Sequence, residues 1–113
     1  MAIFERGDVV KVPFPYTDRA TRHSRPALVV STEGLEDAHG LLWVLMITSA
    51  GNRGWPGDIV IADPITAGLP APSVIRTAKI ATIAATHATR IGRIPAALRR
   101  RVLRQVAASL GTI

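Results

Sequence analysis

The chain has 113 residues, which suits a single domain over 1–113, and its lack of cysteine excludes disulfides and thiolate metal sites. Its formal net charge is +6, twelve of its fourteen basic residues are arginine, and residues 59–113 carry eight basic side chains but only Asp63 as an acid. Arginine binds phosphate oxygens in bidentate fashion, so this charge distribution favours a phosphate-bearing partner, whereas a G- and C-rich genome would explain only the preference for arginine.

The first half of the chain is predicted to form β structure. Residues 9–12 are an apolar strand, and the two prolines that follow it mean that it ends there or lies at a sheet edge. The run 27–31 is apolar on successive residues, as expected of a strand buried on both faces, and 41–49 is the most apolar strand. Residues 32–40 form one helical turn or a loop, and 50–57 is a loop because it contains glycines, an asparagine and a Trp-Pro pair.

The second half continues with shorter elements and ends in a helix. Residues 58–62 and 89–94 are short strands, and 73–83 alternates in the manner of a strand. Apolar residues recur every four positions from Leu98 to Leu110, which predicts a terminal helix. Five or six short strands with one terminal helix predict a mainly β fold, a small barrel whose open edges favour homodimerisation.

Three segments place polar side chains at the ends of predicted strands, where a rigid scaffold can direct them outward. They are His23-Ser24-Arg25-Pro26, Thr48-Ser49-Ala50 and Ile75-Arg76-Thr77-Ala78-Lys79. Each also has a structural interpretation. The arginine of an Arg-Pro pair often caps carbonyl groups or pairs with an acid such as Asp8, and a Thr-Ser pair is often a turn signal.

Several catalytic classes are excluded by what the sequence lacks. It has no cysteine nucleophile, no Gly-x-Ser-x-Gly elbow and no metal-ligand spacing among its three histidines. Carboxylates are too few in the second half for a paired-carboxylate hydrolase, so we expect neither a metal nor another cofactor. No apolar run approaches the ~18 residues of a membrane span, and no signal peptide is evident, so a cytoplasmic protein is expected.

Five segments, taken in order, resemble the MazF/PemK family of type II toxins. They are GDVVKVPFPYTD at 7–18, RPALVVS at 25–31, Thr48-Ser49 closing an apolar strand, SVIRTAKI at 73–80 and IGRI at 91–94 before the terminal helix. The match covers nearly the whole chain with compatible spacing, and its first two segments are the most specific.

The resemblance implies an SH3-like barrel of the CcdB/MazF toxin type with a C-terminal helix, forming a homodimer. It also implies a metal-independent, ribosome-independent endoribonuclease that cleaves single-stranded mRNA through attack of the 2′-hydroxyl. A cognate antitoxin with an acidic, disordered tail is the expected protein partner, because a flexible acidic segment would neutralise a basic groove.

Residue roles follow from the same resemblance. Arg25 and Thr48 match the family's catalytic arginine and threonine, and Ser49 and Arg76 match positions that contact or activate RNA. Some members carry an acid two residues after the Arg76 position, where this chain has Ala78, so no carboxylate base is available there. The residues to which we assign RNA binding are His23, Ser49, Arg53, Arg76 and Lys79.

Two other functions are compatible with such a barrel. A non-catalytic SH3-like nucleic-acid-binding module would explain the charge but not the joint presence of Arg25, Thr48 and Arg76. A CcdB-like toxin directed at gyrase would have no need for the Arg25 and Thr48 pair. Trp55, on the 50–57 loop, is placed either to stack on a base or to pack against protein.

Overall fold

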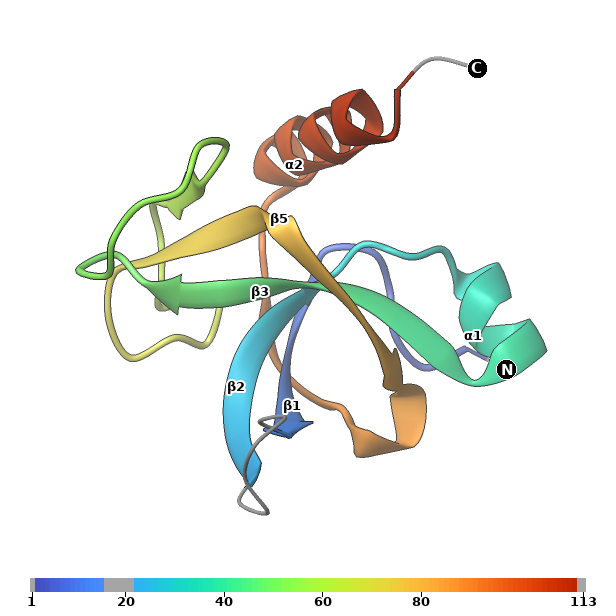
Figure 1. Ribbon diagram of the computed structural model, residues 1–113. Coiled ribbons are helices and arrows are strands. Elements are labelled where there is room, and N and C mark those ends of the chain that lie inside the picture. The colour runs from blue at the N-terminus through green and yellow to red at the C-terminus, as the bar shows by residue number, and fades with distance from the viewer. Residues whose placement is uncertain (1, 16–21, 112–113) are drawn as a thin grey trace.

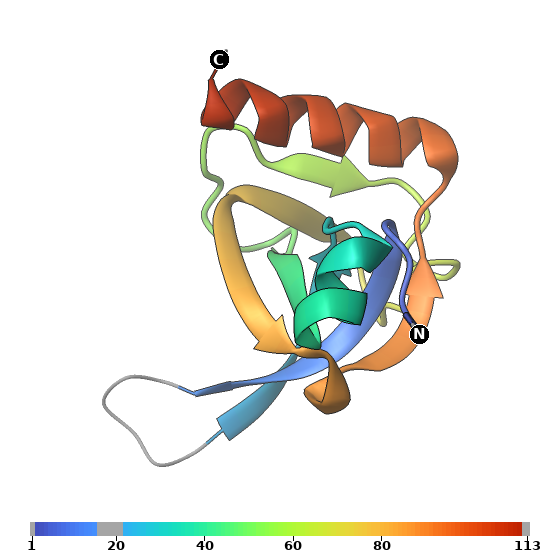
Figure 2. The same ribbon diagram turned by 90° about the vertical axis from the view of Figure 1, so that its right-hand side faces the viewer.

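A computed structural model describes residues 2–15 and 22–111, without the side chains of residues 14–15 and 22–23. Six antiparallel strands form one curved sheet in the order β4-β5-β3-β2-β1-β6, and the terminal helix lies across one side of it (Figures 1 and 2). The elements are β1 (Asp8–Pro15), β2 (Arg22–Val29), α1 (Glu33–His39), β3 (Leu41–Ser49), β4 (Ile59–Ile61), β5 (Ser73–Ala84), the 3-10 helix η1 (Ala85–His87), β6 (Thr89–Arg93) and α2 (Ala96–Leu110).

The central strands are buried on both faces, which explains their continuous apolar runs. Neighbouring residues of one strand point to opposite faces, so Val9 and Val10 belong to different apolar clusters. One cluster lies under α2 and includes Val102. The other lies on the opposite face of the sheet and includes Val44 and Met46. Two separate cores therefore share one sheet.

The prolines of β1 and β2 lie where a strand lacks a partner on one side. β6 pairs with β1 only from Asp8 to Lys11, so Pro13 and Pro15 lie beyond the reach of β6 and face β2 alone. The prediction that these prolines mark a sheet edge is therefore confirmed, although the strand continues to Pro15 instead of ending at residue 12. β2 likewise begins before the Arg-Pro pair, at Arg22, and ends at Val29.

β5 bends sharply near its middle because three of its residues have no partner on β3 (Figure 1). Leu45 of β3 pairs with Ile80, but the adjacent Met46 pairs with Arg76. Thr77, Ala78 and Lys79 therefore form a bulge, and such insertions increase the bend and twist of a strand. The expected regular alternation over 73–83 stops at this point.

The remaining elements differ from the sequence expectation mainly at their boundaries. Residues 33–39 form a short helix that ends at Gly40. Gly40 has a positive φ of 65°, and its amide donates a hydrogen bond of 2.7 Å to the Glu36 carbonyl. β4 is shorter by one residue at each end than the predicted strand 58–62. α2 begins directly after Pro95 and ends at Leu110, as the four-residue periodicity predicts. Within the described part of the chain, no helix is long and apolar enough to cross a membrane.

The buried carboxylate of Asp8 joins the N-terminal segment to β1 and β6. Only 1% of the residue is exposed. Its oxygens accept bonds from the Glu5 amide at 2.8 Å, from Arg90 at 2.9 Å and from Arg93 at 3.3 Å. Arg93 also reaches the carboxylate of Glu5, at 3.3 Å, but that pair is exposed. Asp8 is therefore the ion-pair partner of two arginines of β6.

We expect Asp8→Asn to lower the free energy of unfolding by about 2–4 kcal/mol, because two arginines would lose a buried counter-charge. Glu5→Gln is the matched control, since it removes an exposed partner of the same Arg93 and should cost less than about 1 kcal/mol. Urea unfolding of the three proteins measures both effects. Equal losses for the two variants would contradict the role assigned to burial.

Candidate active site

A cavity of about 410 Å³ opens where β2 and β3 stop pairing, and both predicted catalytic residues line it. The recorded pairing ends at Ala27 of β2 and Met46 of β3. Continuing that register by two residues brings Arg25 opposite Thr48, and strand alternation puts both side chains on the face that carries Met46. Arg25 is exposed and Thr48 is half-buried. The structure thus brings together two residues that are far apart in the sequence.

The other walls of the cavity add polar groups that sequence reasoning did not select. Lys11 of β1, Asn52 of the 50–57 loop and Ser73 of β5 line it, together with the predicted Ser49. Ser73 is buried, and its hydroxyl donates to the Ala71 carbonyl at 2.9 Å. The mainly apolar remainder consists of Pro26, Ile47, Gly68, Leu69, Pro70, Ala71 and Ile91.

The hydroxyl of Thr48 is oriented by Asn52. The amide nitrogen Nδ2 of Asn52 donates to Thr48 Oγ1 at 2.6 Å, and the Asn52 backbone amide donates to the Ser49 carbonyl at 3.0 Å. Because Oγ1 accepts this bond, the hydroxyl hydrogen of Thr48 is directed elsewhere and can be donated to a ligand. An asparagine four residues after a strand-end threonine is the only sequence signal for this contact.

The wall opposite Thr48 depends on a close approach of two backbones. A Cβ atom at Gly68 would lie 2.0 Å from the Ile91 carbonyl oxygen, and one at Gly92 would lie 2.3 Å from the Ala67 carbonyl carbon. Only glycine fits at both positions, so the 63–72 connection lies directly against β6. This contact fixes residues 68–71 at the mouth of the cavity.

Arg76 lies on the same face but outside the cavity, within a cluster that we call the Asp58–Arg76–Trp55 cluster. Its guanidinium donates to Asp58 at 3.1 and 3.3 Å and to the Arg53 carbonyl at 2.7 Å. It also lies 4.4 Å from the centroid of the Trp55 ring. The hydrogen bond from Arg76 lowers the pKa of Asp58 below its usual value. The hydrogen bond that the Trp55 backbone amide donates to Asp58 also lowers this pKa.

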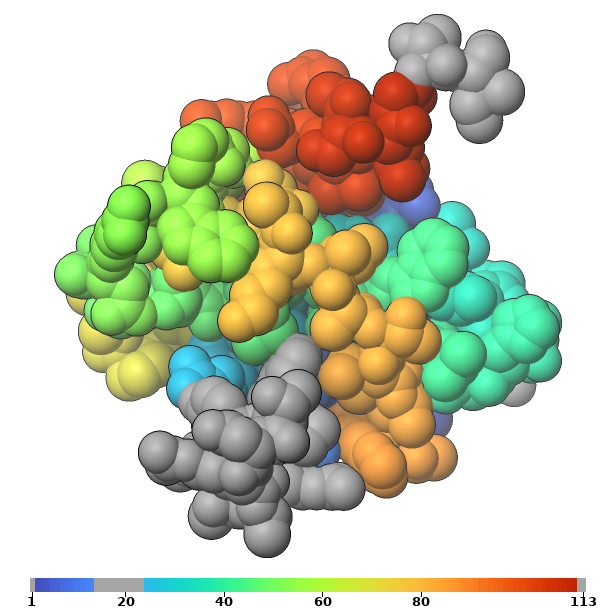
Figure 3. Space-filling model, in the orientation of Figure 1, coloured from blue at the N-terminus to red at the C-terminus, as the bar shows by residue number. Residues whose placement is uncertain are grey.

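The other predicted RNA-binding residues are distributed around this face. Lys79 is exposed within the β5 bulge, and Arg53 is exposed on the loop. Figure 3 shows that loop, in light green, beside the yellow and orange surface of β5. The side chain of His23 lies outside the described residues. Among the described residues, no three His, Cys, Asp or Glu side chains are close enough to bind a metal ion together.

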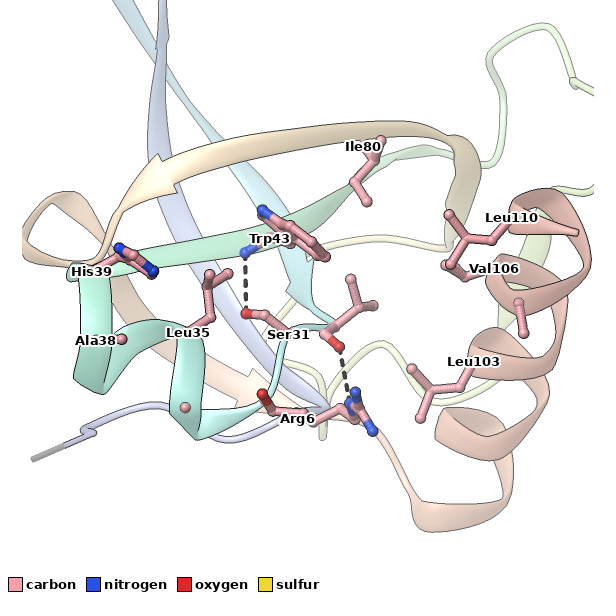
Figure 4. Close-up of a pocket in the computed structure, with 14 residues that line it drawn as sticks. Arg6, Ser31, Leu35, Ala38, His39, Trp43, Ile80, Leu103, Val106 and Leu110 are labelled. Carbon is pink, nitrogen blue, oxygen red and sulfur yellow. Dashed lines mark hydrogen bonds between the residues drawn. The ribbon is translucent and has the colours of Figure 1, made fainter. Parts of the chain in front are cut away.

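A second cavity, of about 630 Å³, lies between α1, β3, β5 and α2 and has a different character (Figure 4). Its lining is mainly apolar, and Trp43, Ile80 and Leu110 are 48%, 53% and 80% exposed. Arg6 at its rim donates to the Val30 carbonyl at 2.9 Å. A largely apolar surface of this kind suits contact with protein better than catalysis on a phosphate.

Comparison with known proteins agrees with the fold described above. The crystal structure of MazE–MazF (Form-III) from Deinococcus radiodurans has a TM-score of 0.78 and 20% identity, with 98% of this chain and 99% of that chain covered. An endoribonuclease in complex with its cognate antitoxin from a mycobacterial species has a TM-score of 0.73 and 18% identity, covering 100% and 98%. The Mycobacterium tuberculosis toxin MazF-mt6 has a TM-score of 0.68 and 19% identity, covering 92% and 97%.

These structural likenesses confirm the predicted fold, a mainly β barrel-like sheet with a C-terminal helix of the MazF type. No curated protein sequence matches the chain. Residues 5–110 match the family described as PemK-like, MazF-like toxin of type II toxin-antitoxin system, and the resemblance noted in the sequence is thereby confirmed. The chain therefore belongs to the family of PemK-like, MazF-like toxins of type II toxin–antitoxin systems.

Proposed function

We propose that this toxin cleaves single-stranded RNA in the cytoplasm, without a metal ion or the ribosome, through its residues Arg25 and Thr48. Toxins of this family are endoribonucleases. The observation that supports the assignment is that Arg25 and Thr48 line one cavity where β2 and β3 separate. Residues 1–113 act as one toxin domain in this proposal.

RNA carries its own nucleophile, so the protein has to align the reaction and stabilise charge. The 2′-oxygen attacks the adjacent phosphorus and loses its proton, the bond from phosphorus to the 5′-oxygen breaks, and the 5′-oxygen gains a proton. Arg25 stabilises the dianionic phosphorane, an effect worth about 3–4 kcal/mol for a well-placed donor. The Thr48 hydroxyl donates to a phosphate oxygen, in an orientation set by Asn52. Lys11 also lines the cavity, but strand alternation places its side chain on the face opposite to that of Arg25.

Among the residues that the structure describes, we assign no carboxylate of the cavity wall to proton transfer. The described residues that line the cavity include no aspartate or glutamate. Ala78 occupies the position where some relatives carry an acid, and it is exposed in the β5 bulge. Charge stabilisation by Arg25 is therefore the larger part of the proposed rate enhancement.

The apolar cavity beside α2 is the proposed contact for a second copy of the chain. Trp43, Ile80 and Leu110 expose apolar side chains around it, and large exposed apolar patches mark interaction sites. The active cavity lies at the other end of β3, near Thr48, so two copies joined in this way would leave both active cavities open.

The first functional prediction concerns the products of cleavage. Purified protein should cut a long RNA in EDTA, leaving a 2′,3′-cyclic phosphate or its opened form on one fragment and a 5′-hydroxyl on the other. A substrate with 2′-deoxyribose at the cut position should resist, because it lacks the nucleophile. End mapping of the fragments distinguishes the cases. Loss of cleavage in EDTA, or 5′-phosphate ends, would contradict the mechanism.

A second prediction separates catalysis from binding. Arg25→Ala should reduce the cleavage rate by about 10²-fold or more, as loss of an oxyanion donor does. It should weaken RNA binding by less than about tenfold, because one phosphate contact is a small part of the total. Arg104→Ala, on the exposed face of α2, is the control and should cleave like the parent protein. The proposal would be wrong if Arg104→Ala lost activity and Arg25→Ala retained it.

A third prediction concerns the antitoxin, for which we propose an acidic, disordered binding tail. Such a segment would direct carboxylates toward Arg25 and exclude RNA from the cavity. An acidic antitoxin peptide and an uncleavable RNA should therefore displace each other in competition binding. Added salt should weaken the binding of the peptide to the toxin without abolishing it. Simultaneous binding of both at full affinity would show that inhibition acts elsewhere.

A further inference from the structure

We propose that Trp55 is a stacking platform for an unpaired RNA base and that the Asp58–Arg76 ion pair holds it in position. The inference rests on the proposed RNA substrate and adds a base-binding subsite beside the cavity. It is carried by the geometry of the Asp58–Arg76–Trp55 cluster.

The cluster fixes the loop at three points. Asp58 continues the β4–β5 register opposite Arg76, and both side chains of this ion pair are only 11% exposed. Asp58 also accepts a bond from the Trp55 backbone amide at 2.9 Å. On the next residue pair, the buried Thr77 donates to the Gly57 carbonyl at 2.9 Å. The indole is therefore attached to β5 and not to a freely moving loop.

One face of the indole is occupied and a large part of the ring remains open. The Arg76 guanidinium lies over the ring at 4.4 Å from its centroid, yet Trp55 is 42% exposed. An exposed aromatic ring that is already ordered binds a flat partner at a low cost in conformational entropy. Nucleobases are such partners, and stacking on them tolerates any sequence because every base has a π-face.

The position of the ring favours RNA over other flat ligands. Arg76 pairs with Met46, which lies two residues before Thr48 on β3, and the side chains of Arg25, Thr48 and Arg76 share one face of the sheet. A strand whose phosphate lies at Arg25 and Thr48 can therefore extend toward Arg76. The exposed Arg53 and Lys79 would attract its neighbouring phosphates.

The chain offers its own matched control, because its two tryptophans are similarly exposed but lie at different cavities. Trp43 is 48% exposed and lines the apolar cavity beside α2, whereas Trp55 lies on the catalytic face. Trp43→Phe leaves Trp55 as the only indole, and Trp55→Phe leaves Trp43 alone. Each variant is titrated with a 2′-O-methyl oligonucleotide of about twelve nucleotides, which cannot supply the attacking hydroxyl.

The expected result is quenching of Trp55 emission at saturation and no change in the emission of Trp43. An abasic oligonucleotide with the same phosphates should bind more weakly and should not quench Trp55. Trp55→Ala should weaken binding of the base-bearing oligonucleotide about tenfold and that of the abasic one little. Circular dichroism checks that the variant is folded. Asp58→Asn removes the charge of the ion pair and perturbs the oxygen that accepts from the Trp55 amide but leaves the indole in place, so it should give a smaller loss of affinity and of quenching.

Two outcomes would overturn the inference. One is Trp55 fluorescence that does not change under saturating oligonucleotide. The other is a Trp55→Ala variant that binds the oligonucleotide as tightly as the parent protein does. Both can be read without cleavage. A protein that quenches on binding but does not cut RNA would refute the proposed nuclease while supporting the platform, and a protein that cuts RNA with a silent Trp55 would do the reverse.

Discussion

The bulge in the middle of β5 is the feature on which most of the structure depends. Because Thr77, Ala78 and Lys79 have no partners on β3, β5 changes direction and serves two parts of the molecule. Its first half pairs with β4 under α2, and its second half curves around the opposite core near η1. Without the bulge, β5 could not both pair with β4 under α2 and turn toward the opposite core.

The same bulge connects the fold with the proposed chemistry. Thr77 is directed inward and donates a hydrogen bond to the Gly57 carbonyl, and the preceding Arg76 is directed to the face that carries Thr48, where it binds Asp58. The loop that starts at Asn52, against Thr48, is thus attached at its far end to β5. The groups to which we assign catalysis and RNA binding are carried by strands or by a loop anchored at both ends, which limits the motion of side chains that would align a phosphate.

Sequence reasoning identified what depends on local pattern. The strands and the terminal helix were located from the apolar runs, the edge prolines and the periodicity of α2. Each of these patterns depends only on residues that are close together in the sequence. Resemblance supplied Arg25 and Thr48, and that assignment stays a prediction. The bulge, the bond from Asn52 to Thr48 and the Gly68–Gly92 contact were not predicted, because each depends on which distant backbone lies opposite. Local hydrophobicity carries no information on that pairing.

The number of arginines overstates how many of them are available to bind RNA phosphates. Arg90 and Arg93 bind the buried Asp8, and Arg76 binds Asp58, so these arginines first satisfy carboxylates of the protein itself. Their positive charge is largely compensated before any phosphate approaches. In the proposed site, Arg76 therefore contributes through the position of Trp55 more than through charge. The surplus of arginine thus serves the binding of the protein's own carboxylates as well as the proposed binding of RNA, and the ion pairs of the structure identify arginines of the first kind.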